Sequence, residues 1–428
     1  MVAKLPSCSL QTNPQKQSSQ TTCCPSSKCF VVEEMENEDI RPQPELPKII
    51  KLRNVKLKPT KEQKMLLRKY EAAARYTYNA TVAAINGGEK INKMDLRNKY
   101  VTAKDNPWIT DKEWLTETPK SIRQQAVFEV VKNFKAAFTN KENGNITKFK
   151  MTYKKKGRHN AQRPWTLGIE KAVKTDGDGD LVIFPETLGK MRYYGLLPFQ
   201  DKPEAECGIH RNAKGDYFLR VPIRVPAKKQ RPPKKIIAMD PGVRKFVTGY
   251  SPTEEHGFYA GKETSERIAQ IQKNIDLVNS QLTSPFADCK QKRRLRKKKM
   301  RLYADCKNVR DDFHWKLANM LTTKYDRILL PRLETAKLSR GLKAKVSRAM
   351  LSQSHGLFLQ RLAEKCKERG ACLETPSERH TSKTCGCCGM LVDVGSSESF
   401  ACRCGYKADR DLNAARNIYI RAETYAES

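Results

Sequence analysis

The chain has 428 residues, of which 82 are Lys or Arg and 47 are Asp or Glu, so its formal net charge is +35. Such an excess of positive charge would strain a compact fold by self-repulsion, and we therefore expect a nucleic acid partner; a merely basic or ribosomal-type protein is the alternative. The sequence has no apolar run of about 18 residues and no apolar core of a secretory signal near its start, so we expect a soluble intracellular protein.

The first part of the chain predicts a polar tail followed by a strand and a long helix. Residues 1–46 are rich in Ser, Gln, Thr and Pro, and we expect them to be disordered because they can bury little apolar surface. Apolar and polar residues alternate through most of Ile49–Leu57, which predicts a strand. Thr60 and Gln63 have the spacing of a capping box, so a helix is expected to begin there and to run to Ala84.

A second helix and two further strands complete this half of the chain. The helix is expected from about Pro119 to Phe138, and the strands at Leu181–Phe184 and Tyr217–Ile223. The segment Lys214-Gly215-Asp216 predicts a hairpin turn before the last of these strands. The segment Val225–Lys235 is rich in Pro and Lys and predicts a linker between the two halves.

The second half alternates short apolar strands with long helices. Strands are predicted at Ile236–Met239, Phe246–Tyr250, Arg327–Leu330 and Ala371–Thr375. Apolar residues recur every three or four positions after Ile268, which predicts a pair of long helices, and another helix is expected over about Ser347–Arg369. This order of elements predicts a mixed α/β domain and is compatible with an RNase H-like core.

Four cysteines near the end of the chain have the spacing of a zinc site: Cys385, Cys388, Cys402 and Cys404. A glycine follows Cys388 and another follows Cys404, which lets backbone amides turn toward the sulfurs. Four thiolates complete the tetrahedral shell, so this Zn²⁺ is expected to fold a finger and to take no part in catalysis. The register of the ligands stays open, because Cys387 could replace a neighbouring ligand and only one residue separates Cys402 from Cys404.

Two acidic residues lie where metal-dependent nucleases place carboxylates. Asp240 ends an apolar strand, and Asp411 begins a helix directly after the cysteines. Such carboxylates can hold two Mg²⁺ ions, which activate water and stabilise the leaving oxygen in a displacement on phosphate. Each residue also has a structural interpretation, since Asp240 could be a turn residue and Asp409 or Asp411 could cap the helix.

Longer motifs around these residues resemble the Fanzor/TnpB family of RNA-guided DNA endonucleases. Met239–Tyr250 resembles the first RuvC motif of that family, and Thr381–Gly389 together with Phe400–Asn413 resembles its finger and third RuvC motif. The similarity extends to Lys58–Gln63 and Arg75–Asn79, so it covers nearly everything after the polar tail.

The resemblance implies a split wedge-like β-barrel with an inserted helical recognition lobe, followed by an RNase H-like RuvC domain with an inserted four-cysteine zinc finger. The expected parts are the tail (1–46), the first part of the wedge barrel (47–58), the helical lobe (59–140), the second part of the barrel (141–232), the RuvC domain (233–380), the zinc finger (381–408) and the last part of the RuvC domain (409–428). The implied activity is cleavage of DNA complementary to a bound guide RNA, with two Mg²⁺ ions at a single RuvC site. The implied partners are guide RNA and double-stranded target DNA, bound by a monomer.

The third catalytic acid is where this sequence departs from the family. The usual glutamate ends a strand in an Ile-Glu-Asp-Leu pattern, but the strand that contains Ile328 has proline in that place. Fanzor proteins and a subset of TnpB relatives have moved the glutamate to the segment before the finger, and Glu378 matches that position, with Glu334 as the alternative. The resemblance therefore implies Asp240, Glu378 and Asp411 as Mg²⁺ ligands and catalytic residues.

Two basic segments are candidates for nucleic acid binding. Nine of the twelve residues in Lys290–Arg301 are basic, and on a helix they would line a channel for the guide–target duplex; a solvated surface or a nuclear-import signal is the alternative. The second segment mixes lysines with Phe149 and Tyr153, a composition that suits RNA or a duplex backbone. The candidates are Lys150, Lys154, Lys155 and Lys156, and Lys292, Arg293, Arg294, Arg296, Lys297 and Lys298.

Two other functions stay open at this point. The displaced glutamate could mean a broken site, which would leave a cleavage-inactive RNA-guided DNA-binding protein. A transposase that acts on DNA ends without a guide is the third hypothesis. The basic runs and the Fanzor resemblance favour a location in the nucleus.

Overall fold

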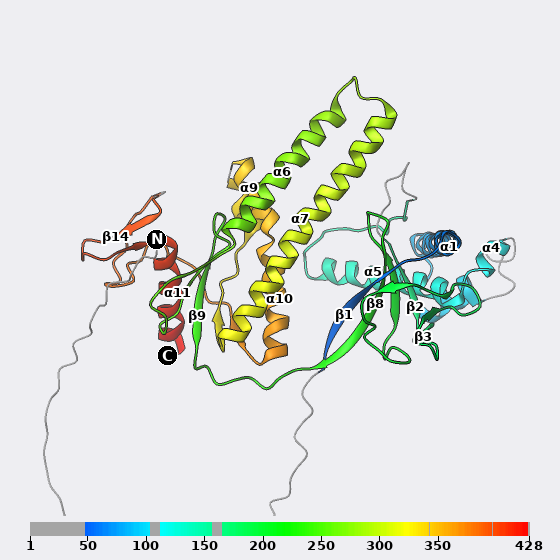
Figure 1. The fold of residues 1–428 in the computed structure, drawn as a ribbon, viewed down its shortest axis with the longest axis horizontal. Coiled ribbons are helices and arrows are strands. Elements are labelled where there is room, and N and C mark those ends of the chain that lie inside the picture. The colour runs from blue at the N-terminus through cyan, green and yellow to red at the C-terminus, as the bar shows by residue number, and fades with distance from the viewer. Residues whose placement is uncertain (1–47, 103–111, 156–164, 342, 396, 427–428) are drawn as a thin grey trace, which may run out of the picture. The chain divides into compact units, whose positions relative to one another are not determined.

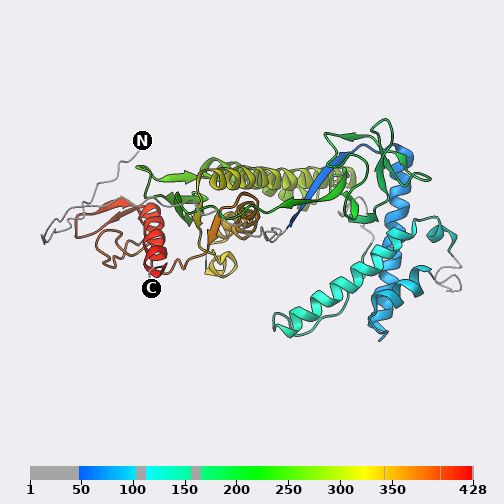
Figure 2. The same cartoon turned by 90° about the horizontal axis from the view of Figure 1, so that it is seen from below.

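The computed structural model describes residues 48–102, 112–155, 165–341, 343–395 and 397–426, so the predicted disordered tail lies outside the described residues. The chain divides into two compact units, one with Lys48–Val225 and Ile271–Cys306, the other with Pro226–Gln270 and Lys307–Ser428. The predicted helical pair is present as α6 (Lys262–Thr283) and α7 (Cys289–Lys324), which run side by side and contribute residues to both units (Figure 1, Figure 2). None of the described helices has the length and hydrophobicity of a membrane span.

In the first unit, short strands form two sheets around one core. The five-stranded sheet has the order β2 (Trp165–Glu170), β7 (Cys207–Arg211), β8 (Tyr217–Pro226), β1 (Lys48–Leu57) and β6 (Tyr193–Tyr194). The three-stranded sheet contains β3 (Val173–Thr175), β4 (Leu181–Ile183) and β5 (Gly189–Lys190). Buried side chains of both sheets, such as Ile169 and Ile183, pack in one cluster. The strands predicted here are confirmed, whereas the closed wedge barrel stays a prediction.

Helices α1 (Lys61–Asn86) and α5 (Lys120–Glu142) pack against each other and against β2. The predicted capping box is present, because the Thr60 hydroxyl accepts the N–H of Gln63 at 3.2 Å and the Gln63 side-chain oxygen accepts the N–H of Thr60 at 2.9 Å. The side-chain amide of Gln63 also donates to the carbonyls of Leu188 and Lys190, both at 2.8 Å, and so fixes the start of α1 to β5. Shorter helices without a counterpart in the predictions are α2 (Lys93–Arg97), η1 (Asn98–Thr102) and α4 (Glu113–Thr116).

The second unit is built on a mixed five-stranded sheet. Its order is β11 (Phe258–Ala260), β10 (Val247–Tyr250), β9 (Ile236–Pro241), β12 (Arg327–Leu329) and β13 (Cys372–Glu374). Strand β10 is antiparallel to β9 and β11, whereas β9, β12 and β13 are parallel. The carboxyl ends of these three parallel strands therefore lie at the same edge of the sheet.

Helices cover both faces of this sheet (Figure 1). Ile237 and Met239 of β9 are buried in a cluster with α7 and α10 (His355–Arg369), whereas Ala238 packs with Ile418 of α11 (Arg410–Ala426). Successive side chains of a strand point to opposite faces, so a strand covered on both faces must be apolar at consecutive positions. This explains why β9 has an unbroken apolar run.

The helix predicted over Ser347–Arg369 is wrong as a single element. It is divided into α9 (Ala344–Gln353) and α10 at Ser354, which has a left-handed backbone conformation with φ 53°. That conformation is uncommon for residues other than glycine, and here tertiary contacts hold it. Arg310 donates to the Ser354 hydroxyl at 3.0 Å, and the Gln353 side chain donates to the Val243 carbonyl.

Candidate metal sites and nucleic-acid surfaces

The four predicted cysteines form the clearest metal site. Two short strands, β14 (Ser399–Ala401) and β15 (Lys407–Asp409), pair in the finger that carries them. The ligand atoms of Cys385, Cys388, Cys402 and Cys404 all lie within 4.8 Å of one another. In the described part of the chain, no other group of three or more His, Cys, Asp or Glu residues comes so close. These sulfurs are close enough to one another to bind one ion such as Zn²⁺, which accepts four thiolate ligands in a tetrahedral arrangement.

Two glycines form turns of the finger, but their own N–H groups bond to carbonyls and not to the sulfurs. Gly389 (φ 76°) and Gly405 (φ 86°) have left-handed conformations, and their N–H groups donate to the carbonyls of Cys385 and Cys402, both at 3.0 Å. Cys387 is exposed and does not belong to the cluster. Its backbone N–H donates to the sulfur of Cys385 at 3.4 Å, so Cys387 supports a ligand through its amide. The ligand register is therefore the one that the spacing favours.

The pKa values of the clustered thiols shift in different directions, because hydrogen bonds between the sulfurs contribute to raising the pKa of Cys388 to about 12 and to raising that of Cys404. Hydrogen bonding from the backbone N–H of Cys404 is the largest of the effects that lower the pKa of Cys402 to about 7. Phe400 is fully buried in the finger and packs with Cys385 and Tyr406, which gives this small element an apolar core. With four thiolates bound, an ion would have no open position for a substrate, so the cluster is suited to a structural role.

The predicted acids lie at the edge of the second unit's sheet where its parallel strands end. Asp240 follows Met239 in β9 and so shares the face of Ala238, which packs toward α11. Burial, followed by the negative charges of Asp411 and Glu378, raises the pKa of Asp240 to about 8. The charges of two acids from distant parts of the chain therefore act on Asp240, and the catalytic role of the three residues stays a prediction.

The neighbouring aspartates at the start of α11 have different surroundings. Asp409 caps the helix, because its side chain accepts the N–H groups of Asp411 at 2.9 Å and Leu412 at 3.1 Å. Its other oxygen pairs with Lys245 at 2.8 Å, a contact that the sequence analysis missed. The capping interpretation thus applies to Asp409, and Asp411 lies in the first helical turn, where the helix dipole favours negative charge.

Both candidates for the third acid lie near this edge. Burial and then the negative charge of Glu334 raise the pKa of Glu378, so the two glutamates are neighbours. Glu378 is half-buried and its charge also acts on Asp240, whereas Glu334 is exposed. These observations favour Glu378 as the residue that shares a site with Asp240.

The three carboxylates fit divalent cations by their chemistry. Carboxylate oxygens are the ligands that Mg²⁺ prefers, and a bound cation would offset both the burial and the neighbouring negative charges that raise the pKa of Asp240. Their oxygens do not form a group within 4.8 Å, as the cysteine sulfurs do. The three acids are therefore not arranged around one tightly held ion, and two ions about 4 Å apart can be bound by oxygens that are farther from one another.

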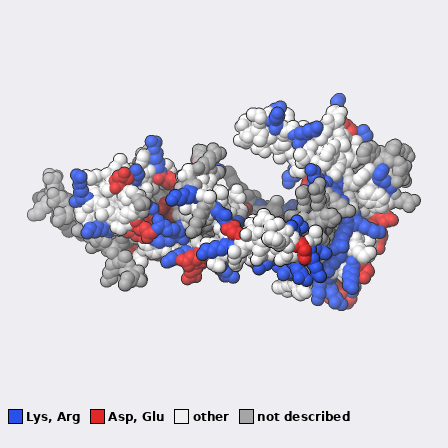
Figure 3. Space-filling view, turned by 90° about the horizontal axis from the view of Figure 1, so that it is seen from above, with Lys and Arg blue, Asp and Glu red and all other residues white. Residues whose placement is uncertain are grey.

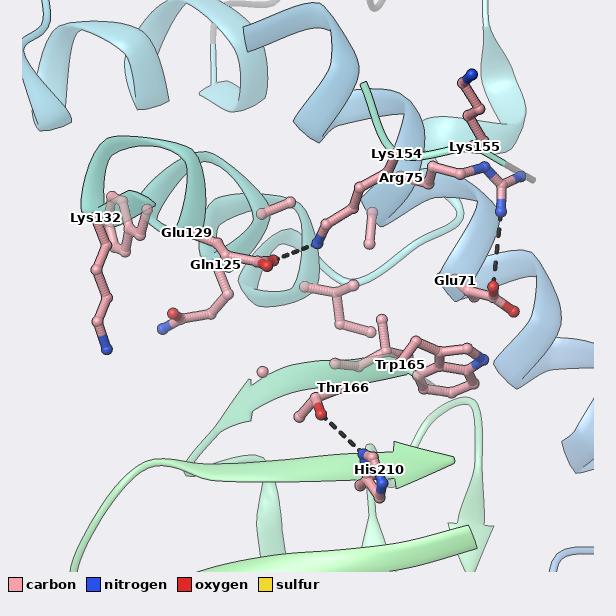
Figure 4. Close-up of a pocket in the computed structure, with 16 residues that line it drawn as sticks. Glu71, Arg75, Gln125, Glu129, Lys132, Lys154, Lys155, Trp165, Thr166 and His210 are labelled. Atoms are coloured by element: carbon pink, nitrogen blue, oxygen red, sulfur yellow. Dashed lines mark hydrogen bonds and ion pairs between the residues drawn. The ribbon is translucent and has the colours of Figure 1, made fainter. Parts of the chain in front are cut away.

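A cleft of about 680 Å³ lies in the first unit between helices α1 and α5 and strand β2 (Figure 4). Its wall includes the ring of Trp165, the amide of Gln125 and the hydroxyl of Thr166, which is within 3.0 Å of His210. Lys154 pairs with Glu129 at 2.6 Å and, with the exposed Lys155, lines the same cleft. An aromatic ring with polar groups and lysines is a composition suited to nucleic acid.

The remaining basic candidates lie on the surface. Lys150 is exposed, and Lys156 lies outside the described residues. The predicted basic run is helical, in the first part of α7, where Arg293, Arg294, Arg296, Lys297 and Lys298 are exposed and Lys292 is half-buried. Lys and Arg side chains are densely gathered on part of the molecular face shown in Figure 3, while Asp and Glu are fewer. Nucleic acid binding by these residues stays a prediction.

Comparison with known proteins places the chain in a family. Residues 219–342 match a family described as "Probable transposase", and residues 355–418 match the "Cas12f1-like, TNB domain". The "TnpB-like protein L79" of Acanthamoeba polyphaga mimivirus is 27% identical over 85% of this chain and 72% of the relative. The "Putative transposase A625R" of Paramecium bursaria Chlorella virus 1 is 41% identical over 381 residues, covering 87% of each chain. The chain belongs to the TnpB/IS605 transposase family.

This is a family of TnpB- and Cas12f-like RNA-guided DNA endonucleases or transposases. The "Putative RNA-guided DNA endonuclease InsQ" of Escherichia coli K12 aligns with 85% of this TnpB-family chain over 90% of its own length, at 23% identity. A cryo-EM structure of a Cas12f1-sgRNA-target DNA complex has a TM-score of 0.51, covering 84% of this chain and 83% of the other at 15% identity. The mixed α/β fold is thus shared with Cas12 proteins, and the Fanzor branch stays a prediction.

Proposed function

We propose that this protein is an RNA-guided DNA endonuclease that hydrolyses phosphodiester bonds at Asp240, Glu378 and Asp411. The observation that carries the proposal is the position of Asp240 at the end of β9, on the strand face that packs toward α11, whose first turn contains Asp411. Burial and then the charges of Asp411 and Glu378 raise the pKa of Asp240, which agrees with this arrangement. Acids from three distant segments that repel one another in a partly dry site are a costly arrangement unless cations bind there. The alignment with InsQ along most of both chains supports the guided activity.

The sheet of the second unit supports an RNase H-like core. Strand β9 is in the centre of the sheet. On one side of it lie β10 and β11, each antiparallel to the strand before it in the sheet, and on the other side lie β12 and β13, both parallel to β9. This order and these directions are those expected of that fold. Asp240 is then on the central strand, and Asp411 is on the helix that packs against it. The two acids have rigid supports, which a site for phosphoryl chemistry requires.

The side chains have separable roles in this proposal. Asp240, Asp411 and Glu378 would hold two Mg²⁺ ions, which when bound supply an activated water and neutralise the charge that develops on the phosphate. Asp409 is not assigned to the metal ions in this proposal, because it caps α11 and pairs with Lys245, and so fixes the helical turn that carries Asp411. The cysteine finger would hold Zn²⁺ and so fix the conformation of the chain segments before and after it.

The nucleic acids are proposed to bind through the basic and aromatic surfaces. The exposed basic residues of α7 provide charge for phosphates of a guide–target duplex, which needs no sequence recognition by the protein. The cleft beside Trp165 offers a ring for stacking and an amide, Gln125, for a base edge. We propose that guide RNA and target DNA occupy these surfaces in a monomeric ribonucleoprotein.

The choice between the two glutamates gives a direct prediction. Glu378→Gln is expected to lower the cleavage rate by about 100-fold or more, because a neutral amide is a weaker ligand for a hard cation. Glu334→Gln is the matched control and is expected to stay within about threefold of the wild type, since Glu334 is exposed, whereas the charge of Glu378 acts on Asp240. Single-turnover cleavage of a matched target measures both. The reverse order of effects would assign the third acid to Glu334.

The function itself is tested with the purified complex. RNA that copurifies with the full-length chain is sequenced, and a DNA duplex matching that RNA is incubated with the complex in Mg²⁺ or in EDTA. Cleavage is expected only for the matched duplex and only with Mg²⁺. Cutting that is independent of RNA would support a guide-independent transposase, and RNA-dependent binding without cutting would support the inactive binder.

A further inference from the structure

Two buried asparagines on α11 connect the helix to the finger. Asn413 and Asn417 are one turn apart, and their exposed fractions are 0% and 7%. The Asn413 side chain donates to the Thr384 carbonyl at 2.8 Å and accepts the N–H of Gly386 at 3.0 Å. The Asn417 side chain donates to the carbonyls of Thr381 and Thr384, at 2.8 and 2.6 Å. We call these four hydrogen bonds the asparagine clamp.

The clamp residues lie in close contact with the first metal-binding turn. Gly386 lies directly after Cys385, and a Cβ atom added there would be 2.9 Å from the Asn413 side-chain oxygen and 3.4 Å from that of Asn417. A backbone that approaches amide side chains this closely requires glycine. The position of α11 is therefore set against the same turn that supplies two thiolates to the metal cluster.

The clamp also reaches the segment of the third acid. The N–H and the hydroxyl of Thr381 both donate to the Glu378 carbonyl, at 3.3 and 2.9 Å. The Thr381 carbonyl is in turn held by Asn417, in the helix whose first turn carries Asp411. A short chain of hydrogen bonds thus runs from Glu378 through Thr381 to α11, and most of it is buried.

From these contacts we propose that Asn413, Asn417 and Thr381 are positioning residues, which fix Glu378 and Asp411 relative to each other and to the zinc-binding turn. The inference rests on the proposed metal site formed by these two acids with Asp240. Loss of the Asn417 amide would remove the clamp bond to the buried Thr381 carbonyl and leave the Thr384 carbonyl only its bond from Asn413, so the turn would shift away from α11. The separation of the acids would then change although no metal ligand is altered.

The test compares variants of the full-length chain that remove one donor each. Asn417→Asp replaces the donating amide by an acceptor that faces two carbonyls, and Thr381→Val removes only the hydroxyl bond to Glu378 with little change of shape. Asn86→Asp is the matched control, because the Asn86 amide donates to the Met151 carbonyl at 3.1 Å in the other compact unit. Each variant is examined for Mn²⁺ affinity by calorimetry, zinc content, melting temperature and single-turnover cleavage.

Asn417→Asp is expected to weaken Mn²⁺ binding and to slow cleavage by about 10-fold or more, and Thr381→Val by several-fold, while Asn86→Asp leaves both within about twofold. Zinc content is expected to remain at one ion per chain in all of them. Wild-type Mn²⁺ affinity in folded Asn417→Asp and Thr381→Val would overturn the inference, and so would a lower melting temperature as their sole defect. Failure of the proposed function is distinguishable, since it appears as absent guided cleavage in the wild type.

Discussion

Replacing Asp240 by Asn is expected to reduce single-turnover DNA cleavage by about 1,000-fold, while RNA binding and target binding stay within about twofold of the wild type. Asp240 is on the central strand of its sheet and is the acid on which the charges of Asp411 and Glu378 act. A neutral amide there would remove a hard ligand from the proposed metal pair. Cleavage assays and binding measurements on the same ribonucleoprotein preparation provide the comparison.

The same variant has a second expected property, which excludes unfolding as the cause of its slower cleavage. The folded-state pKa of Asp240 is raised from 3.8 to about 8, so in the metal-free protein its contribution to stability is present below pH 3.8 and is lost as the pH rises toward about 8. The amide side chain of Asp240→Asn cannot ionise, and in EDTA at pH 8 the variant should therefore melt at a higher temperature than the wild type. Asp312→Asn, on the exposed surface of α7, is the control for the substitution itself. Loss of nucleic acid binding together with cleavage would contradict the assignment.

Replacing Cys385 by Ser is expected to lower the zinc content from about one ion per chain to nearly none. Cys385 is the most buried of the four ligands, and a structural zinc site contributes about 10 kcal/mol or more of folding free energy, which depends on a complete ligand set. Cleavage is expected to fall with the zinc, because the turn that carries Cys385 is bound to α11 by the asparagine clamp. Elemental analysis of the purified protein measures the ion directly.

Cys387→Ser is the matched control for the zinc experiment. Cys387 is exposed, and it contributes its backbone N–H to the sulfur of Cys385. The serine variant keeps that N–H, so zinc content and cleavage should both stay at the wild-type level. Loss of zinc in Cys387→Ser, or its retention in Cys385→Ser, would show that the ligand register differs from the one described.

Features with a local cause could be predicted from the sequence. The capping box at Thr60 depends on residues three positions apart, and the glycine turns of the finger depend on the residues beside each cysteine pair. The apolar run of β9 likewise indicates a buried strand, because a strand whose sheet is covered by helices on both faces must be apolar at consecutive positions. For the capping box and the glycine turns, the interactions that decide the conformation lie within a few residues, whereas for β9 only the apolar pattern is local and the covering helices are distant in the chain.

Features that depend on distant partners could not be predicted. The break at Ser354 is held by Arg310, which belongs to another helix, and nothing in the surrounding sequence indicates it. The sequence leaves the roles of Asp409 and Asp411 open because either can cap a helix. In the structure Asp409 is the cap, and its pairing with Lys245, far away in the chain, distinguishes its role from that of Asp411. Glu334 and Glu378 follow parallel strands, so both approach the same edge, and they are distinguished by their different exposure and by the effect of Glu378 on Asp240.

The central position of β9 also has a consequence for how the molecule folds. Its parallel partner β12 is joined to it through a connection that contains both α6 and α7, and closing so long a loop has an entropy cost that local helix formation does not. We therefore expect the helices to form early and the β9–β12 pairing and the docking of α11 to come late. A nascent or partly folded copy would then lack the proposed cleavage centre, and DNA would be exposed to cutting only by copies whose folding is nearly complete.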